Sequence, residues 1–284
     1  MRVVHNVAEL RIAVKALREE GLRIGFVPTM GFLHEGHASL IRQSKNRCDA
    51  TVVSIFVNPT QFGPSEDLAS YPSDLEADQS LCLKMGVNLL FLPTAAEMYP
   101  SAFQTFIEPG SVAEPLCGKY RPGHFRGVAT VVAKLFNMVQ PDLAFFGQKD
   151  LQQTVVIKRM VKDLNMPVDI AVVPTLREHD GLAMSSRNIY LSADERKRAL
   201  CISLGLFAAE AAFMAGERDT ASLLTRANEC LWGVDELQYC ELVDAQSLDP
   251  LVGQVGQVDR TAAICVAAYV GSTRLIDNIL LSPN

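Results

Sequence analysis

Two histidines three residues apart follow a predicted buried strand at residues 22–27. The connecting segment reads Pro-Thr-Met-Gly-Phe-Leu-His-Glu-Gly-His, from Pro28 to His37. Ligands of open α/β sheets bind at the carboxyl ends of strands, where the next helix offers N–H groups and a positive dipole to phosphate. We therefore interpret the histidine pair as part of a triphosphate site. A chance pair or a metal pair is the alternative, but zinc helices space their histidines four residues apart.

Two later segments contain cations that can neutralise phosphates. Gly147-Gln148-Lys149-Asp150 follows a predicted strand, so Lys149 can face phosphate while Asp150 accepts hydrogen bonds from ribose. The alternative is an ordinary turn in which Asp150 caps the next helix. Met184-Ser185-Ser186-Arg187 combines two hydroxyls with a guanidinium, which suits either a mobile phosphate clamp or the entry of a helix.

Amide side chains indicate a small, oxygen-rich acid as a second ligand. Asn58 and Gln61 follow the second predicted strand, and Gln153 lies one helical turn beyond Asp150. An ordinary loop turn explains Asn58 and Gln61 equally well. The segment Arg-Pro-Gly-His-Phe-Arg-Gly at 121–127 concentrates cations in an acidic chain, which favours an anion site over a surface turn.

The elements that must position these residues alternate as strands and helices over the first two-thirds of the chain. Short apolar strands separated by helices predict a parallel sheet covered on both faces. We expect an α/β fold, with a Rossmann-like parallel-sheet domain over residues 1–174 and a smaller α+β domain over residues 175–284. The predicted strands are 22–27, 50–57, 88–92, 142–146, 168–173, 238–243 and 262–270, and the predicted helices are 6–20, 36–47, 73–85, 127–139, 151–164, 193–216 and one ending near 232.

Composition excludes several classes of protein. The 284 residues are 49% hydrophobic and 20% charged, and the net charge of −6 argues against nucleic-acid binding, which needs a basic face. The apolar run at 261–271 is too short to cross a bilayer. Seven scattered cysteines without a Cys-x-x-Cys pair fit a reducing compartment, so we expect a soluble, cytoplasmic protein. P-loop and Gly-x-Gly-x-x-Gly motifs are absent from the sequence.

Five segments in this order resemble the pantoate–β-alanine ligases, or pantothenate synthetases, of the His-x-Gly-His nucleotidyltransferase group. They lie at residues 28–37, 54–62, 121–127, 147–150 and 184–188, and the likeness continues to Arg-Leu-Ile-Asp-Asn at 274–278. The resemblance implies ATP-dependent condensation of (R)-pantoate with β-alanine through a pantoyl-adenylate. It also implies release of AMP and pyrophosphate, a requirement for Mg²⁺, and a homodimer. By the same resemblance, residues 1–174 form the ATP- and pantoate-binding domain and residues 175–284 form a lid domain.

The resemblance further implies roles for individual residues. ATP is bound by Met30, Gly31, Phe32, Leu33, His34, Glu35, Gly36, His37, Gly147, Gln148, Lys149, Asp150, Leu176, Met184, Ser185, Ser186 and Arg187. Pantoate is bound by Gln61 and Gln153, and we expect Asn58 to bind it beside them. Gln61 also borders β-alanine, and Asp78 occupies a position linked to the metal. We expect His34, His37, Lys149 and Arg187 to carry catalysis by stabilising charge on phosphate. Cys117 stands where many relatives have Glu, which puts in doubt an ion pair with Arg121 but not the chemistry.

Two other functions fit the same motifs. One is a nucleotidyltransferase of this group that acts on a different small acid or on a phosphate acceptor. The other is a non-catalytic nucleotide- or metal-binding regulator. Pantoate-dependent pyrophosphate exchange separates the ligase from the first, and ATP binding without turnover would indicate the second. Lys149 and the Ser-Ser-Arg segment argue against both, since a sensor needs no groups that release pyrophosphate.

Overall fold

The computed structural model describes residues 1–64, 66–251 and 258–283. Contacts within the chain group its residues into two compact units. The first contains residues 1–110, 121–148 and 156–174, and the second contains 111–120, 149–155 and 175–284. The second unit therefore includes two segments that precede residue 175 in the chain, and the predicted domain boundary itself stays a prediction.

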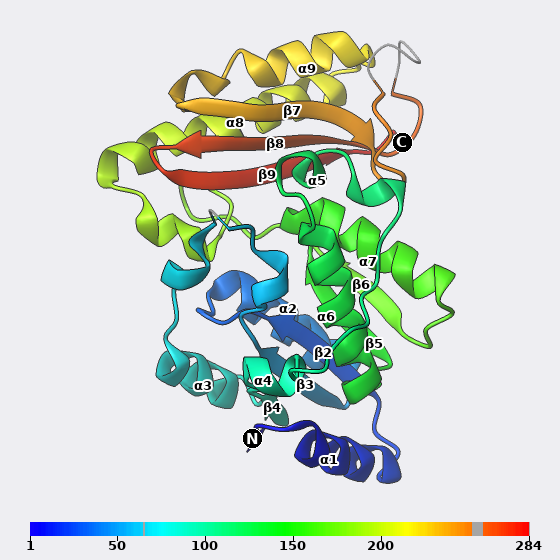
Figure 1. The fold of residues 1–284 in the computed structure, drawn as a ribbon. Coiled ribbons are helices and arrows are strands. Elements are labelled where there is room, and N and C mark those ends of the chain that lie inside the picture. Colours follow the sequence, from blue (N-terminus) through cyan, green and yellow to red (C-terminus); the bar gives the residue numbers. More distant parts are fainter. Residues whose placement is uncertain (65, 252–257, 284) are drawn as a thin grey trace. The chain divides into compact units, whose positions relative to one another are not determined.

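The first unit is built on a six-stranded parallel sheet, which confirms the Rossmann-like fold predicted from the alternating pattern. Its strand order is β1-β4-β3-β2-β5-β6 (Figure 1). The chain adds β3 and β4 on one side of β2 and then β5 and β6 on the other, so the order reverses between β2 and β5. The strands are β1 (Arg2–Val4), β2 (Ile24–Thr29), β3 (Ala50–Ile55), β4 (Leu89–Phe91), β5 (Leu143–Gly147) and β6 (Asp169–Val173).

Helices cover both faces of this sheet because neighbouring strand residues are apolar on both sides. Val27 of β2 packs in a cluster with Leu40 of helix α2. Its neighbour Phe26 points to the other face, where its ring lies 6.4 Å from the ring of Phe136 in helix α6. The helices are α1 (Val7–Glu19), α2 (Glu35–Arg47), α3 (Leu75–Lys84), α4 (Ala95–Met98), α6 (His124–Val139) and, from Val156 on, α7 (Leu151–Asp163).

The second unit contains a three-stranded antiparallel sheet, β7-β8-β9, that packs against two helices (Figure 1). This confirms the predicted α+β class of the C-terminal part. Ser192 and Glu195 form a reciprocal capping box at the start of the long helix α8. The elements are α5 (Cys117–Tyr120), α8 (Ala193–Met214), α9 (Thr220–Asn228), β7 (Glu236–Asp244), β8 (Ala262–Val270) and β9 (Thr273–Leu281).

Two strands were not predicted from the sequence, for physical reasons. β1 is only three residues long, which is too short for an alternating pattern to appear. β9 contains Asp277 and Asn278, which are 5% and 3% exposed, so polar residues stand where a buried strand is normally apolar. Among the described residues, no helix is long and apolar enough to cross a membrane.

Candidate active site

The carboxyl ends of β2 and β5 bring two of the predicted ATP segments to one edge of the sheet. The two strands pair directly, and the strand order reverses between them. Residues 30–37 follow β2, while Gly147 ends β5 and Gln148 comes next. A Cβ added at Gly147 would meet no atom within 4 Å, so the space beside its backbone is open. A switch point of this kind is where open α/β sheets bind ligands.

The two histidines form a reciprocal cap at the start of α2. His34 is the N-cap residue, and its Nδ1 accepts a hydrogen bond from the N–H of Gly36 at 3.1 Å. The N–H of His34 donates to Nδ1 of His37 at 3.2 Å, and the ring centroids lie 4.1 Å apart. Because each Nδ1 accepts, each neutral ring carries its proton on Nε2. The hydrogen-bond donor of each neutral ring is therefore its Nε2, while Nδ1 holds the helix start.

Asp78 fixes the loop that leads into this cap. Gly31 and Phe32 have φ values of +90° and +50°, in the left-handed region. The N–H groups of Phe32 and Leu33 donate to the two carboxylate oxygens of Asp78 at 2.8 and 2.6 Å. Burial raises the pKa of Asp78, and these hydrogen bonds oppose the rise. Two backbone amides of the predicted ATP segment are thus engaged by the protein itself.

The same contacts decide what Asp78 can offer to a metal ion. Both of its oxygens already accept backbone N–H groups. Among the residues that the structure describes, no three His, Cys, Asp or Glu side chains come together as a metal site. Mg²⁺ is commonly held by one or two carboxylates together with substrate phosphates. The donor set therefore fits an ion carried by a triphosphate, toward which Asp78 retains lone pairs, and does not fit a resident metal centre.

Asn58 is committed to the protein, and its neighbour Gln61 lies beside the ATP segment. Asn58 is 1% exposed, and its Nδ2 donates to Oε1 of Gln61 at 3.0 Å and to the carbonyl oxygen of Gly127 at 3.2 Å. Its Oδ1 accepts from the Tyr99 hydroxyl at 2.8 Å. Nε2 of Gln61 lies 3.1 Å from Sδ of Met30. The structure thus brings a predicted pantoate residue next to a predicted ATP residue, with Asn58 orienting the former.

The cation-rich segment at 121–127 contacts the turn that contains Gln61. Arg121 donates to both carboxylate oxygens of Glu66, at 2.8 and 2.5 Å. Nδ1 of His124 lies 2.8 Å from the carbonyl oxygen of Gln61. Burial raises the pKa of Glu66, but hydrogen bonds and charge from Arg121 outweigh it, so the pKa lies below its ordinary value. Arg121 therefore binds a carboxylate of the chain itself, which replaces the external anion predicted from the sequence.

In the second unit, one loop joins two of the predicted ATP segments. The N–H of Met184 donates to the carbonyl oxygen of Leu176 at 3.0 Å. Ser185 then caps the short 3₁₀ helix Ser186–Tyr190, because its hydroxyl accepts from the N–H of Arg187 at 3.3 Å. The interpretation of Ser185 as a helix-entry residue is thus correct as far as its backbone contact goes, and its role toward ATP stays a prediction.

Both ends of this loop contain a buried polar atom that lacks a partner. Among the described residues, Oγ1 of Thr175 and Oδ1 of Asn188 are buried without a hydrogen bond. The amide nitrogen of Asn188 is satisfied, since it donates to Glu178 at 2.8 Å. Buried polar groups without a partner are rare and mark places where water or a ligand completes the bonding. These two atoms lie next to Leu176 and Arg187 in sequence.

Gln152 is held by the protein through its side chain, whereas Lys149 and Gln153 have fewer contacts within the described residues. The Lys149 side chain is 19% exposed, and its Nζ lies 3.9 Å from the carboxylate of Asp150. The half-buried Gln153 side chain makes no hydrogen bond to any described residue. Gln152 is 6% exposed and accepts from the N–H of Cys117 at 2.9 Å. This structural role of Gln152 left no signal in the sequence, because two adjacent glutamines on a helix look alike.

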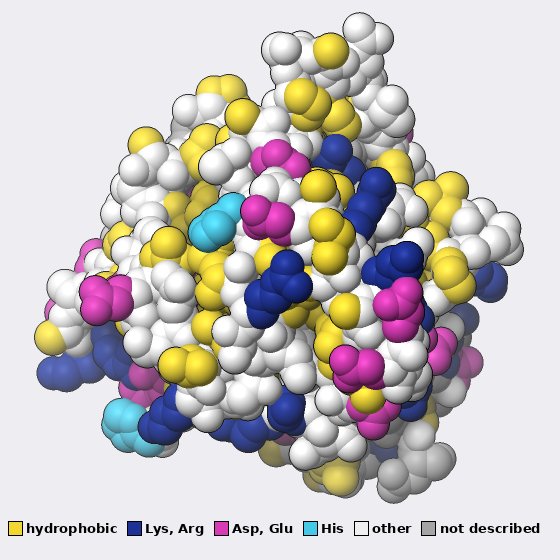
Figure 2. All heavy atoms as spheres, turned by 90° about the horizontal axis from the view of Figure 1, so that it is seen from below, with side chains coloured by type: hydrophobic (Ala, Val, Ile, Leu, Met, Phe, Trp, Pro, Cys, Tyr) yellow, Lys and Arg dark blue, Asp and Glu magenta, His cyan; other side chains and the backbone are white. Residues whose placement is uncertain are grey.

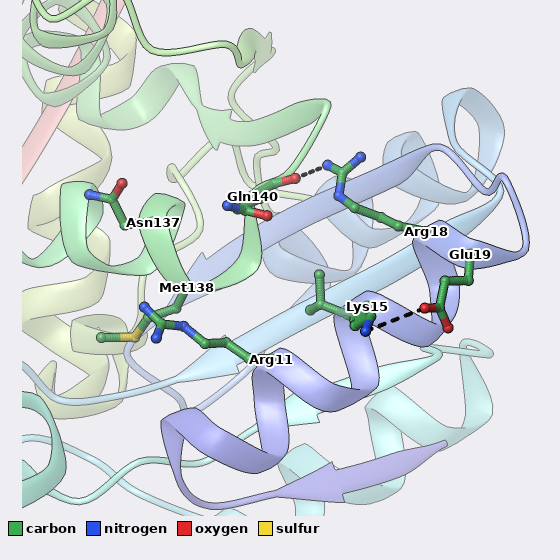
Figure 3. Close-up of a pocket in the computed structure, with 8 residues that line it drawn as sticks. Arg11, Lys15, Arg18, Glu19, Asn137, Met138 and Gln140 are labelled. Atoms are coloured by element: carbon green, nitrogen blue, oxygen red, sulfur yellow. Dashed lines mark hydrogen bonds and ion pairs between the residues drawn. The ribbon is translucent and has the colours of Figure 1, made fainter.

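A groove elsewhere on the first unit is accounted for by the protein's own contacts. It has a volume of about 440 Å³ and lies between α1 and the end of α6 (Figure 3). Arg18 donates to the carbonyl oxygen of Gln140, the C-cap residue of α6, and Lys15 pairs with Glu19 at 3.6 Å. Cations at a helix C-terminus stabilise its dipole. Figure 2 shows that Lys and Arg side chains are interspersed with Asp and Glu side chains on the face of the protein that it presents.

Comparison with known proteins gives one consistent result. Residues 2–280 match the family described as pantoate-beta-alanine ligase. The chain is 60% identical to pantothenate synthetase 1 of Bradyrhizobium diazoefficiens, over 99% of each chain. The crystal structure of pantothenate synthetase from Thermus thermophilus is similar with a TM-score of 0.93, at 45% identity and with 100% of both chains covered. The crystal structure of the pantoate-beta-alanine ligase from Francisella tularensis, complexed with beta-gamma ATP and beta-alanine, is similar with a TM-score of 0.80. Its identity is 34%, and the match covers 100% of this chain and 99% of the other.

Substitution of His34 separates helix capping from phosphate binding. Asn is a good N-cap whose side-chain oxygen can replace Nδ1, but it has no donor at the position of Nε2. We expect His34→Asn to melt close to wild type while single-turnover pyrophosphate release falls on the order of a hundredfold, the loss of ~3 kcal/mol of charge stabilisation. His34→Ala should also lose about 1 kcal/mol of stability. A normal rate in His34→Asn would contradict the donor role.

Gly127 tests whether the packing of α6 positions Gln61. A Cβ there would lie 2.4 Å from the carbonyl oxygen of Thr60 and 2.7 Å from Cα of Gln61, so the turn must move. We expect Gly127→Ala to raise KM for the small acid about tenfold and to cost about 1–3 kcal/mol of stability. Gly110→Ala is the matched control, since its Cβ would meet no atom within 4 Å. The idea fails if both variants show the same KM.

The Glu66–Arg121 pair predicts a pH-dependent stability. The pKa of Glu66 is lowered from 4.5, so its contribution is present at neutral pH and lost as pH falls through the lowered value. Glu66→Gln should destabilise the protein by about 1–2 kcal/mol at pH 7, since the pair is partly exposed. The difference from wild type should shrink as pH falls below the ordinary pKa of 4.5 and vanish once pH lies below the lowered pKa of Glu66. Urea unfolding measures this. Glu108→Gln, which breaks a pair with Arg126 that is 72% exposed on the Glu side, should change little at either pH.

Proposed function

Because this chain belongs to the pantoate-beta-alanine ligase family, it is an ATP-dependent ligase that joins pantoate to β-alanine, and we propose the residues that do so. The observation that carries the proposal is the match over residues 2–280, which spans every segment singled out from the sequence. The alternative of a nucleotidyltransferase for another acceptor is not favoured, since the relatives are named as ligases of pantoate and β-alanine.

ATP is bound by residues 30–37, 147–150, Leu176 and 184–187. The geometry supports this assignment through the Nδ1 bonds of His34 and His37, which leave Nε2–H as the donor on each ring. Both rings donate to phosphate oxygens that gain charge during reaction. Lys149, Ser185, Ser186 and Arg187 stabilise the departing pyrophosphate by charge and hydrogen bonding.

Pantoate is bound by Gln61 and Gln153, and Gln61 also borders β-alanine. The half-buried Gln153 makes no hydrogen bond to the described part of the protein, which supports a ligand as its partner. Asn58 has a different role from the one expected, because its amide is occupied by Gln61, Gly127 and Tyr99. We assign it to orienting Gln61 and not to direct contact with pantoate.

The reaction proceeds in two steps because a carboxylate is a poor acylating agent. An oxygen of the pantoate carboxylate attacks the α-phosphorus of ATP, and the bond to the β-phosphate oxygen breaks, which releases pyrophosphate. The amine of β-alanine then attacks the acyl carbon, and AMP leaves with the bridging oxygen. The protein supplies position and charge stabilisation instead of a covalent group.

Three further assignments complete the proposal. Mg²⁺ accompanies the phosphates, where it would offset their charge, and Asp78 is the carboxylate that can face it. The protein acts as a homodimer, as the resemblance implies, and sedimentation of the purified protein tests this. It works in the cytoplasm, which is supported by seven cysteines that are all free thiols.

The order of chemistry is tested by leaving β-alanine out. With ATP, Mg²⁺ and pantoate labelled with ¹⁸O in its carboxylate, we expect stoichiometric pyrophosphate and a pantoyl-adenylate detectable by mass spectrometry. Addition of β-alanine should then move one label into AMP. A reaction without pantoate is the control. Pyrophosphate that appears only when β-alanine is present, even in a single turnover at high enzyme concentration, would overturn the adenylate route.

A further inference from the structure

The segment Arg-Leu-Ile-Asp-Asn at 274–278 lies on β9 and has no role in the function described so far. Two of its polar side chains are almost completely buried, since Asp277 is 5% exposed and Asn278 is 3% exposed. Burial of a polar group costs free energy unless the group is hydrogen-bonded. The hydrogen-bond partners of Asp277 and Asn278 therefore indicate the role of these two side chains. Those partners belong to two of the predicted ATP segments or flank them.

Asn278 contacts the backbone of Lys149 directly. Its Nδ2 donates to the carbonyl oxygen of Lys149 at 2.9 Å. The backbone N–H of Asn278 donates to Oδ1 of Asp277 at 2.8 Å, so the two side chains form one connected group. Fixing the carbonyl of Lys149 fixes the starting point of its long side chain. The position of its ammonium therefore depends on β9.

Asp277 contacts the loop that contains Leu176 and Met184. Arg177 donates to both carboxylate oxygens of Asp277, at 2.6 and 3.1 Å, and to the carbonyl oxygen of Gly181 at 3.2 Å. This bidentate geometry fixes the guanidinium in direction as well as distance. Arg177 directly follows Leu176, whose carbonyl oxygen accepts from Met184.

The same loop is also held by ion pairs within the unit, so the loop that Asp277 contacts has a defined conformation. Arg196 of α8 donates to Glu178 and to Asp180, each at 2.7 Å. The loop is thus attached to α8 on one side and to β9 on the other. Of these attachments, only the one through β9 is also connected to Lys149 among the described residues.

We infer that Asp277 and Asn278 are positioning residues, which hold Lys149 and the Leu176–Met184 loop in one fixed arrangement for ATP. The inference rests on the proposed roles of Lys149 and this loop. It goes beyond them in assigning to β9 the task of setting the mutual geometry of Lys149 and the loop. Displacement of a charge-stabilising group by a fraction of an ångström lowers the rate without unfolding the protein.

Replacement of Asn278 in the full-length enzyme tests the contact with Lys149. We expect Asn278→Ala to lower kcat/KM for ATP about tenfold and to leave KM for pantoate within about twofold. Asn278→Asp keeps the shape but lacks the Nδ2 donor, so it should show the same loss, and it serves if the alanine variant does not fold. The matched control is Asn228→Ala, which removes an Nδ2 bond to the carbonyl oxygen of Leu224 in the same unit. That control should keep normal kinetics.

A double-mutant cycle with Lys149→Ala separates positioning from a merely structural role. If Asn278 acts through Lys149, its replacement should cost less than about twofold once the Lys149 side chain is gone. The same tenfold loss in both backgrounds would overturn the inference. A normal rate in the Lys149→Ala single variant would instead overturn the proposed function of Lys149. The two failures are therefore distinguishable in one set of four proteins.

Asp277→Asn tests the second contact, because it keeps the size of the side chain and removes the charge that faces Arg177. We expect KM for ATP to rise about tenfold with kcat less affected, since the loop carries Leu176 and Met184, which are proposed to bind ATP. Arg177→Lys should reproduce the effect, because lysine cannot make the bidentate contact. Normal KM values for ATP in both variants, with melting temperatures near wild type, would overturn this half of the inference.

Discussion

The hydrogen bonds on the two Nδ1 atoms of His34 and His37 are the constraint on which the candidate site depends. They close the first turn of α2 and also decide which nitrogen of each ring carries the proton. A serine or aspartate cap would hold the helix equally well but would offer no donor on its far side. The same two side chains therefore cap the helix and supply the donors that are proposed to bind phosphate.

The amide side chains discussed above fall into two groups: some bind the protein itself, and others are proposed to bind ligands. Asn58 orients Gln61, Gln152 holds the backbone at Cys117, and Asn278 holds the backbone at Lys149. Each of these buried, hydrogen-bonded amides contacts, or directly precedes in sequence, a residue proposed to touch a substrate. Such buried networks are rigid because loss of one partner leaves another polar group unsatisfied.

The sequence was sufficient for the sheet and insufficient for these supporting contacts. Alternation of apolar strands and helices predicted the parallel sheet, since burial on both faces leaves a pattern that can be read locally. The strand β9 was not predicted because Asp277 and Asn278 satisfy their polar groups with partners far away in sequence. The contacts of Asn58 with Gln61, Gly127 and Tyr99 were not predicted for the same reason, since an asparagine after a strand looks alike in sequence whether it faces a ligand or a backbone carbonyl. The capping role of His34 was not predicted, because histidine is an unusual N-cap, and its role toward ATP stays a prediction.

The approach of α6 to the turn at Thr60 has a consequence for how the enzyme can change over evolution. At Gly127 the contact is between main chain and main chain, so a substitution there can only add atoms and push the turn, and none can remove atoms to make room for a larger acid. Acceptance of a bulkier acid would need an insertion or a shift of a whole helix, which is a rare event compared with a point mutation. Selectivity that is built from backbone is therefore expected to drift slowly, and attempts to broaden it by screening single substitutions should concentrate on the unsupported side chain of Gln153.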